Sequence, residues 1–169
     1  MRSVKFSSTS DDPTANNNKP TRTISWQVTD ANSDVAGAAT SLSATSTINV
    51  TAVNDAPIIS SGATVAYTEK DTAAVISSGL TLSDPDNANL TGATISIGNF
   101  VAGDILSFTN TANITASYNS ATGVLTLSGT DTVANYQAAL RSIKFNSTSD
   151  DPTANNTKPN RTITFTAND

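Results

Sequence analysis

The sequence predicts an all-β chain, built as an antiparallel β-sandwich repeat with one short helix and repeated in a tandem array. Three observations support this prediction. Short stretches of alternating apolar and polar residues recur at near-regular spacing, and Gly, Asn, Asp or Pro bound them. A single stretch, residues 131–142, has apolar residues at helical spacing instead. Finally, one long segment occurs twice.

The repeated segment is residues 1–30, which align with residues 140–169 at an offset of 139. Of the 30 aligned positions, 20 are identical, and the differences at apolar positions mostly keep bulk. We therefore expect residues 1–53 to be the C-terminal part of one repeat, and residues 54–169 to be the N-terminal and central part of the next. In this register each piece lacks strands, which a neighbour would complete, whether covalently joined or not.

The first piece is predicted to hold strands at residues 2–6, 22–28 and 46–53, separated by polar loops. In the last two of these strands, apolar residues alternate with polar ones, as a half-buried strand requires. Pro57 favours an extended residue before it and cannot continue a ladder, so we interpret Asn54-Asp55-Ala56-Pro57 as the junction between domains.

The second piece is predicted to hold many short strands and the helix. The strands are expected at residues 57–60, 64–67, 74–76, 80–82, 93–97, 105–109, 114–118, 124–127 and 142–145. Asp131 or Thr132 can cap the helix at residues 131–142. One face of this helix would be apolar, with Val133, Tyr136, Ala139 and Leu140.

Composition excludes several classes of function. The chain has no Cys and no His, which removes thiol catalysis, Ser-His-Asp arrangements and the usual zinc ligands. A net charge of −5 gives no basic footprint for nucleic acid, and no apolar run is long enough for membrane insertion. Carboxylates are concentrated in loops rather than paired in a predicted cleft, so we do not expect an enzyme.

Clustered acidic and amide side chains are the main chemical signal. Calcium takes six to eight oxygen ligands, and alternating Asp and Asn in a turn such as residues 84–89 can direct several oxygens to one point. The alternative is a solvated turn in which Asp accepts backbone N–H groups. The candidate metal ligands are Asp11, Asp12, Asp30, Asn54, Asp55, Glu69, Asp84, Asp86, Asn87, Asp150 and Asp151.

Three stretches resemble the bacterial cadherin-like repeats of giant surface adhesins. Val53-Asn54-Asp55-Ala56-Pro57 resembles their junction motif, and Leu82-Ser83-Asp84-Pro85-Asp86 resembles the Asp-x-Asp segment of a cadherin interface site. The stretch from residue 131 to residue 165 is similar to the same family at the level of pattern. The resemblance covers most of residues 54–169 and implies a cadherin-like or immunoglobulin-like sandwich.

The resemblance also implies a set of ligands. Asn54 and Asp55 would share calcium with Asp84 and Asp86 of the following domain, and Glu69 would face the next junction. The Asp-Arg-Glu element of the family is not found in this sequence. Its place would be taken by the paired aspartates of the two Asp-Asp-Pro loops, Asp11, Asp12, Asp150 and Asp151.

Together these expectations describe a calcium-stabilised structural repeat of a long extracellular bacterial adhesin or surface filament, secreted or held at the cell surface, that gives reach, rigidity and cohesion. Its partners would be neighbouring repeats of the same protein, joined covalently or as a strand-sharing homopolymer, with cell-surface or matrix polysaccharide as a further candidate. The alternative is a carbohydrate-binding sandwich module, which needs an exposed pair among the aromatic residues Trp26, Tyr67, Tyr118 and Tyr136.

Three further residue pairs follow from the repeat. Trp26 and Phe165 occupy equivalent positions and are predicted to fill the core, because both alternate with polar neighbours. The cations at equivalent positions of the two loops are predicted to be charges at the rim of the domain: Lys19, Arg22, Lys158 and Arg161.

Overall fold

The computed structural model describes residues 3–31 and 37–169, which form two compact units, Met1–Asn54 and Asp55–Asp169. The boundary predicted from the sequence lies one residue earlier. Asn32 and Asp34, which extend the acidic pattern around Asp30, lie outside the described residues. The prediction of antiparallel strands with one short helix is confirmed.

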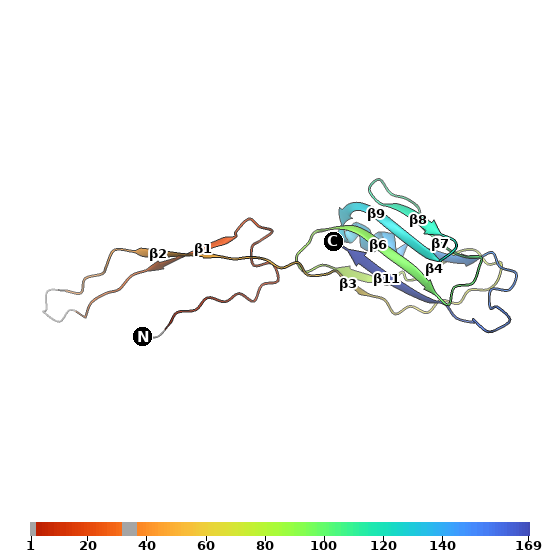
Figure 1. Cartoon of the computed structure of the whole chain (residues 1–169), viewed down its shortest axis with the longest axis horizontal. Helices are drawn as coiled ribbons and strands as arrows, with labels where there is room; N and C mark the ends of the chain where they lie inside the picture. The colour runs from red at the N-terminus through yellow and green to blue at the C-terminus, as the bar shows by residue number, and fades with distance from the viewer. Residues whose placement is uncertain (1–2, 32–36) are drawn as a thin grey trace. The chain divides into compact units, whose positions relative to one another are not determined.

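Unit 1 contains a two-stranded antiparallel sheet of β1 (Thr21–Trp26) and β2 (Ala44–Asn49) (Figure 1). Thr21 pairs with Asn49, and Trp26 pairs with Ala44 at the other end of the ladder. The indole N–H of Trp26 also donates to the hydroxyl of Ser46 at 3.0 Å. Long polar loops flank this hairpin, as the sequence predicts.

Unit 2 is organised around a four-stranded antiparallel sheet with the order β11-β6-β9-β8 (Figure 1). Its strands are β6 (Asn89–Gly98), β8 (Thr115–Asn119), β9 (Val124–Thr132) and β11 (Thr162–Asn168). In β6, the buried Ala93, Ile95 and Ile97 alternate with less buried Thr and Ser. This period of two directs one face of the sheet to the core.

Two smaller sheets and the helix complete unit 2. The first sheet has the order β4-β10-β7 and the second pairs β3 with β5, all antiparallel. The strands are β3 (Ile58–Ser60), β4 (Ala74–Val75), β5 (Thr81–Ser83), β7 (Asp104–Ser107) and β10 (Lys144–Ser147).

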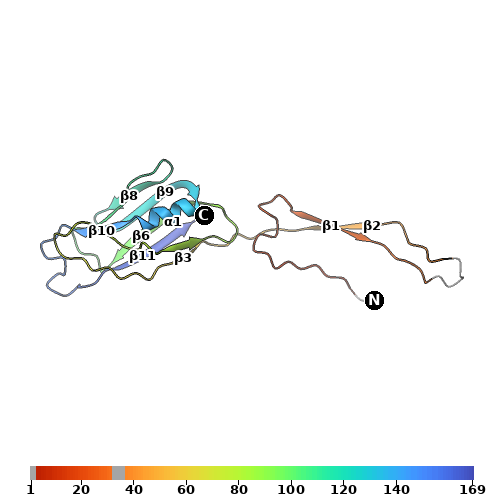
Figure 2. The same cartoon turned by 180° about the vertical axis from the view of Figure 1, so that it is seen from behind.

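Helix α1 (Val133–Arg141) lies across β6 and β9, as Figure 2 shows. Thr132 is its N-cap, and the Thr132 hydroxyl accepts the backbone N–H of Asn135 at 3.2 Å. No helix in the described part of the chain is long and apolar enough to cross a membrane.

The core lies in unit 2. It joins one face of the four-stranded sheet to the apolar face of α1, where Tyr136, Ala139 and Leu140 are buried. Burial of each large apolar side chain contributes about 1.5–3 kcal/mol. The buried apolar residues are Leu80, Leu82, Leu90, Ala93, Ile95, Ile97, Leu106, Ile114, Leu125, Leu127, Tyr136, Ala139, Leu140 and Ile143.

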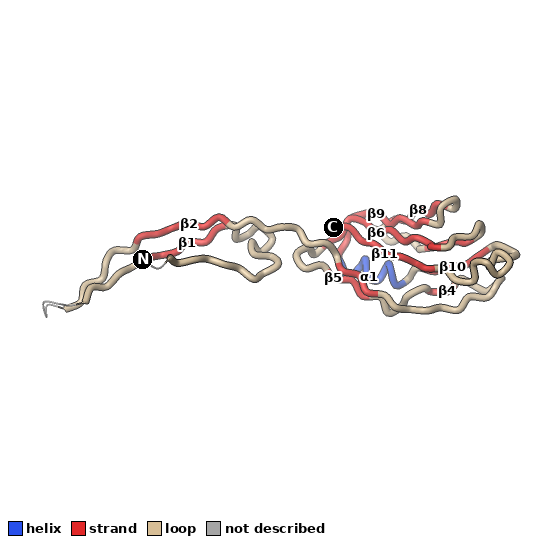
Figure 3. The backbone as a smooth tube through the Cα atoms, turned by 60° about the horizontal axis from the view of Figure 1, so that its bottom comes forward, coloured by secondary structure: helices blue, strands red, loops and turns tan. Residues whose placement is uncertain are grey.

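Two predicted strands do not form. Residues 3–6 and 64–67 carry alternating patterns, yet neither segment pairs with another strand in the described chain (Figure 3). The copy of residues 3–6 in unit 2 leads into β10, which pairs with β4 and β7. Unit 1 holds no copy of β4 or β7, so the same sequence has no ladder to join there.

Candidate metal centre

The topology of the four-stranded sheet brings the end of β11 to the beginning of β6. The two strands are antiparallel, and Asn168 pairs with Gly92. The residue after β11, Asp169, therefore lies beside the acidic turn that precedes β6. One carboxylate oxygen from each of Asp84, Asp86 and Asp169 lies within 4.8 Å of the others, a group of three acidic residues found among the described residues.

Asp84 has two oxygens with different surroundings. Its Oδ1 accepts the backbone N–H groups of Asp86 (3.1 Å) and Asn87 (2.7 Å), which closes the turn. Its Oδ2 is buried and has no hydrogen-bond partner among the described residues. A buried carboxylate oxygen without a partner carries a desolvation cost, which a bound cation would remove.

Asp86 holds the turn to the start of unit 2. Its Oδ2 accepts the backbone N–H of Asp55 at 3.2 Å, and its Oδ1 accepts from the side-chain amide of Asn87 at 3.2 Å. Burial raises the pKa of the Asp86 carboxyl, and the negative charges of Asp84 and Asp55 raise it further. The carboxylates therefore repel one another in the absence of a counter-ion.

Asn87 joins the turn to the end of β11. Its side-chain amide donates to Asp169 Oδ2 at 2.9 Å as well as to Asp86. The oxygen and nitrogen of a side-chain amide can exchange places, because a rotation of 180° about the last side-chain bond presents the oxygen where the nitrogen was. Asn87 can thus donate to the carboxylates in one orientation and offer a fourth oxygen to a cation in the other.

Asp169 was not among the predicted metal ligands, although the repeat indicates it. Asp30 is a predicted ligand, and Asp169 is its copy at the offset of 139. In unit 1, the Asp30 carboxylate accepts the N–H of Ala39 at 3.0 Å. Asn54 ends unit 1, and a shared cation with Asp84 and Asp86 stays a prediction.

The paired aspartates of the two loops lie apart from the three clustered carboxylates. Asp12 accepts the N–H of Asn16 (2.8 and 3.0 Å), and Asp151 accepts the N–H of Asn155 (2.7 Å). Both loops are therefore turns in which an Asp accepts a backbone N–H group, the alternative to a metal-ligand role. Their neighbours Asp11 and Asp150 are exposed.

Glu69 lies near the loop of Asp150 rather than near the cluster. It forms an ion pair with Lys70 at 2.9 Å, and Lys70 lies 4.0 Å from Asp150. Since this loop precedes β11 and Asp169 follows it, the two acidic regions lie at opposite ends of that strand (Figure 1). A role for Glu69 at a second junction stays a prediction.

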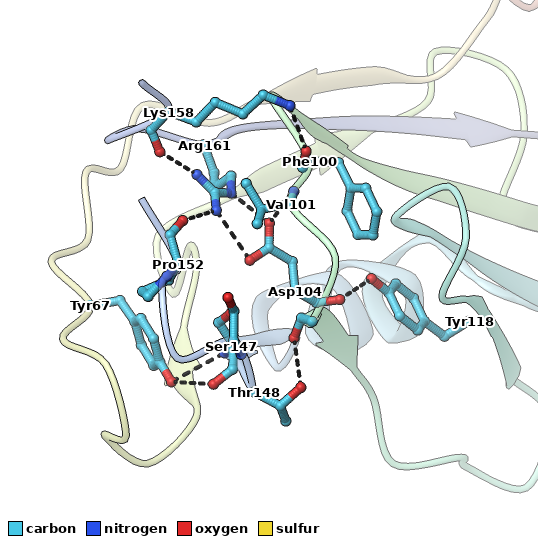
Figure 4. Close-up of polar contacts among 12 residues, drawn as sticks. Tyr67, Phe100, Val101, Asp104, Tyr118, Ser147, Thr148, Pro152, Lys158 and Arg161 are labelled. Carbon is cyan, nitrogen blue, oxygen red and sulfur yellow. Dashed lines mark hydrogen bonds and ion pairs between the residues drawn. The ribbon is translucent and has the colours of Figure 1, made fainter. Parts of the chain in front are cut away.

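The prediction that Arg161 is a rim charge is wrong. Its side chain is largely buried, and its Nε donates to Asp104 Oδ2 at 2.5 Å, as Figure 4 shows. The guanidinium also donates to the carbonyls of Pro152 and Lys158, so it holds the Asp-Asp-Pro loop against β7. Asp104 is fully buried, and the repeat could not reveal it as the partner of Arg161, because unit 1 contains no copy of Asp104.

The aromatic residues are distributed unevenly. Trp26 is 41% exposed, although the sequence predicts a core position, whereas its copy Phe165 packs against the core. Tyr136 is buried, and both Tyr67 and Tyr118 are half-buried. Of these four residues Trp26 alone is exposed, and carbohydrate binding stays a prediction.

Comparison with family models, with curated proteins and with solved structures finds no match for this chain. The cluster of Asp84, Asp86 and Asp169 is therefore the feature that points most directly to a function. Its three carboxylates, one oxygen of which is buried and unpartnered within residues 3–31 and 37–169, could hold a metal ion.

Proposed function

We propose that this chain is a calcium-stabilised structural repeat of a long extracellular bacterial adhesin or surface filament. One observation supports the proposal most directly: Asp84 Oδ2 is buried beside the carboxylates of Asp86 and Asp169 and has no hydrogen-bond partner in the part of the chain that the structure describes. The internal repeat and the resemblance of residues 53–57 and 82–86 to cadherin-like junctions support the same reading. On this proposal each repeat is a cadherin-like or immunoglobulin-like sandwich in a tandem array.

Calcium fits this ligand set better than other common metals. Every candidate ligand is an oxygen, and the chain has no Cys or His to favour zinc or copper. The three carboxylates come from two separate segments, a turn and a strand end, and calcium accepts such irregular geometry more readily than magnesium does. Asn87 and water would complete the six to eight oxygens.

The cation would act as a clamp between segments that are distant in sequence. It would join the turn at Asp84 and Asp86 to the end of β11 at Asp169. Asp86 also accepts the backbone N–H of Asp55, so the first residue of unit 2 is tied to the same cluster. Without the ion, repulsion between the carboxylates would loosen all three segments. With it, the start of each repeat would be fixed, which a stiff array requires.

The composition supports an extracellular location for this role. A secreted protein without Cys has no disulfides to stiffen it, and bound calcium can take their place. The net charge of −5 and the many small Ser, Thr, Asn and Ala residues suit a long soluble surface protein.

Isothermal titration calorimetry of the whole chain with calcium tests the proposal. Calcium should bind with heat release or uptake, and Asp84→Asn should weaken binding by about tenfold or more, because it removes the unpartnered carboxylate oxygen. This substitution keeps the oxygen that closes the turn. Asp150→Asn is the matched control, since its side chain is 99% exposed and lies outside the cluster. Calcium binding that is absent, or equal in both variants, would refute the proposal.

A further inference from the structure

An open strand edge lies beside a groove in unit 2. Among the described residues, β11 is the last strand of its sheet and pairs on one side alone, with β6. Beside it lies a groove of about 280 Å³ that runs between β11 and residues 61–67. Its lining combines apolar and aromatic side chains with polar ones; the former include Val65, Tyr67, Ile76, Phe145, Ile163 and Phe165, and the latter include Thr153, Asn160 and Arg161. Residues 64–67 of this lining belong to the predicted strand that finds no partner in the described chain (Figure 3).

The internal repeat indicates which strand fits this edge. β1 is the copy of β11 at the offset of 139, and β1 pairs with β2. Because β1 and β11 occupy equivalent positions in the repeat, a strand that pairs with one should pair with the other. The β2 sequence is therefore the natural occupant of the open edge.

The hydrogen-bonding directions show that β1 and β11 offer the same edge. In an antiparallel pair, the N–H and C=O of one residue face the same neighbour, and successive residues alternate. The carbonyls of Pro20 and Val28 accept from Val50 and Ser41, both at 2.8 Å, so even-numbered residues near β1 face β2. Because the offset of 139 is odd, the copies of these even-numbered residues near β11 have odd numbers.

The odd-numbered residues of β11 face away from β6. Ile97 of β6 donates its N–H to Gly123 at 3.1 Å and so faces β9, which leaves Ser96 facing β11. Its partner Thr164, and with it the other even-numbered residues of β11, must face β6. Ile163 and Phe165 consequently direct their backbone groups to the open edge, as their copies do toward β2.

The β2 segment also has the side-chain pattern that the groove requires. One face carries Ala44, Ser46, Ile48 and Val50, and the other carries Thr45, Thr47, Asn49 and Thr51. When the β1–β2 register is transferred, Ile48 lies opposite Arg161, Ser46 opposite Ile163 and Ala44 opposite Phe165. Small residues of β2 would thus meet the bulky residues of β11 on the groove side.

The side chains of β2 are little buried when β2 pairs with β1 in unit 1. Ile48 and Val50 are half-buried, and several large apolar side chains of unit 1 are exposed, including Val4, Trp26, Val28 and Leu42. A transfer of β2 from β1 to a β11 edge keeps the number of backbone hydrogen bonds and adds apolar burial in the groove.

We propose that the edge of β11 and its groove bind the β2 strand of a second copy of this chain. The strand is antiparallel to β11, with Thr45 opposite Thr164 and Ile48 opposite Arg161. Reciprocal exchange gives a dimer, and one-way exchange gives an open chain of copies. This association adds a partner to the proposed structural role and does not depend on calcium.

Cysteine crosslinking between two singly substituted full-length chains tests the register. The chain has no Cys, so Thr164→Cys and Thr45→Cys introduce one thiol in each copy. Residues opposite each other in this type of pair have Cα atoms close enough for a disulfide. In chelator, this mixture should crosslink about tenfold faster than a mixture of Ser117→Cys and Thr45→Cys, because the aligned thiols have a higher effective concentration. Ser117 lies on β8, the opposite edge of the same sheet.

Analytical ultracentrifugation of matched variants tests the occupant. Ile48→Lys should weaken self-association by about tenfold or more, since it removes an apolar side chain from the groove and places a second cation opposite Arg161. Thr47→Lys, on the outer face of the same strand, should have little effect. A chain with a copy of residues 31–53 appended after Asp169 should fill its own groove and stay monomeric. Equal crosslinking of the two mixtures, a wild-type chain that stays monomeric up to about 1 mM, or association unaffected by Ile48→Lys would overturn the proposal. None of these results would bear on calcium binding.

Discussion

The two copies of the repeated segment share their sequence but differ in their surroundings. Val4 is 73% exposed in unit 1, whereas its copy Ile143 is fully buried in unit 2. Trp26 is 41% exposed, whereas Phe165 packs against the core. The core of unit 2 comes largely from residues 80–139, of which unit 1 contains no copy. An apolar pattern therefore specifies which face can be buried, while other segments must supply the burial.

The Asp-Asp-Pro loops show the opposite behaviour. Both copies place three consecutive residues at positive φ, at residues 15–17 and again at residues 154–156. In both, the second Asp accepts a backbone N–H four residues later. In both, an Arg donates to the carbonyl of the loop Pro. This structure forms in either surroundings, so short-range contacts are sufficient to specify it.

The largest expected difference between the copies is the loss of stability when Ile143, or its copy Val4, is truncated to Ala. Ile143→Ala should lower the free energy of unfolding of unit 2 by about 3–4 kcal/mol, because it leaves a cavity in a fully buried site. Val4→Ala, at the equivalent position, should change stability by less than about 0.5 kcal/mol. Chemical denaturation followed by hydrogen exchange in each unit measures both. Similar losses from the two substitutions would show that unit 1 has a core of its own.

The loop arginines should give a somewhat smaller difference. Arg161→Ala leaves the buried carboxylate of Asp104 without its partner and should cost about 3 kcal/mol. Arg22, the copy of Arg161, makes its hydrogen bonds to loop carbonyls near the surface, so Arg22→Ala should cost about 1 kcal/mol or less. Denaturation midpoints of the two variants provide the comparison. An equal cost at the two sites would mean that the ion pair adds nothing to the loop contacts.

The smallest expected effect is confined to unit 2 and depends on pH. The side-chain amide of Asn135 and the N–H of Thr132 both donate to Asp131 and lower its pKa below the ordinary 3.8. The ionised form is thus favoured in the folded state, and its stabilising effect is present above pH 3.8 and lost as the pH falls through the lowered value.

Thermal unfolding tests this effect. Asp131→Ala should lower the Tm slightly at about pH 7, and the difference from wild type should vanish at about pH 2. Asp131→Asn keeps an acceptor for the same N–H groups and should show a weaker dependence on pH. A constant difference between wild type and Asp131→Ala over this range would assign the loss to packing instead.

Much of the fold follows from the sequence because its signals are local. The alternating patterns, the N-cap at Thr132 and the turns at Gly and Asn predict most of the strands and the helix. The segments that fail, residues 3–6 and 64–67, have the pattern of a strand but lack a partner to pair with. Pairing is a long-range property, so local alternation cannot reveal whether a partner is present.

The candidate site was predictable in part for the same reason. Asp84, Asp86 and Asn87 lie in one turn, and their spacing predicts that their oxygens meet. Asp169 reaches them only because β11 is antiparallel to β6, which no local pattern specifies. The ion pair of Arg161 with Asp104 also joins distant segments, and it was missed because surface exposure was inferred from charge alone.

Hydrogen exchange of the whole chain, with calcium and with a chelator, tests the central claim most directly. If a cation joins Asp84, Asp86 and Asp169, calcium should slow exchange at residues 83–90 and at the end of β11. The loop around Asp30, the copy of Asp169 in unit 1, should not respond, because unit 1 holds no copy of Asp84 or Asp86. Exchange at residues 83–90 that is unchanged by calcium, or slowed equally around Asp30, would contradict the account.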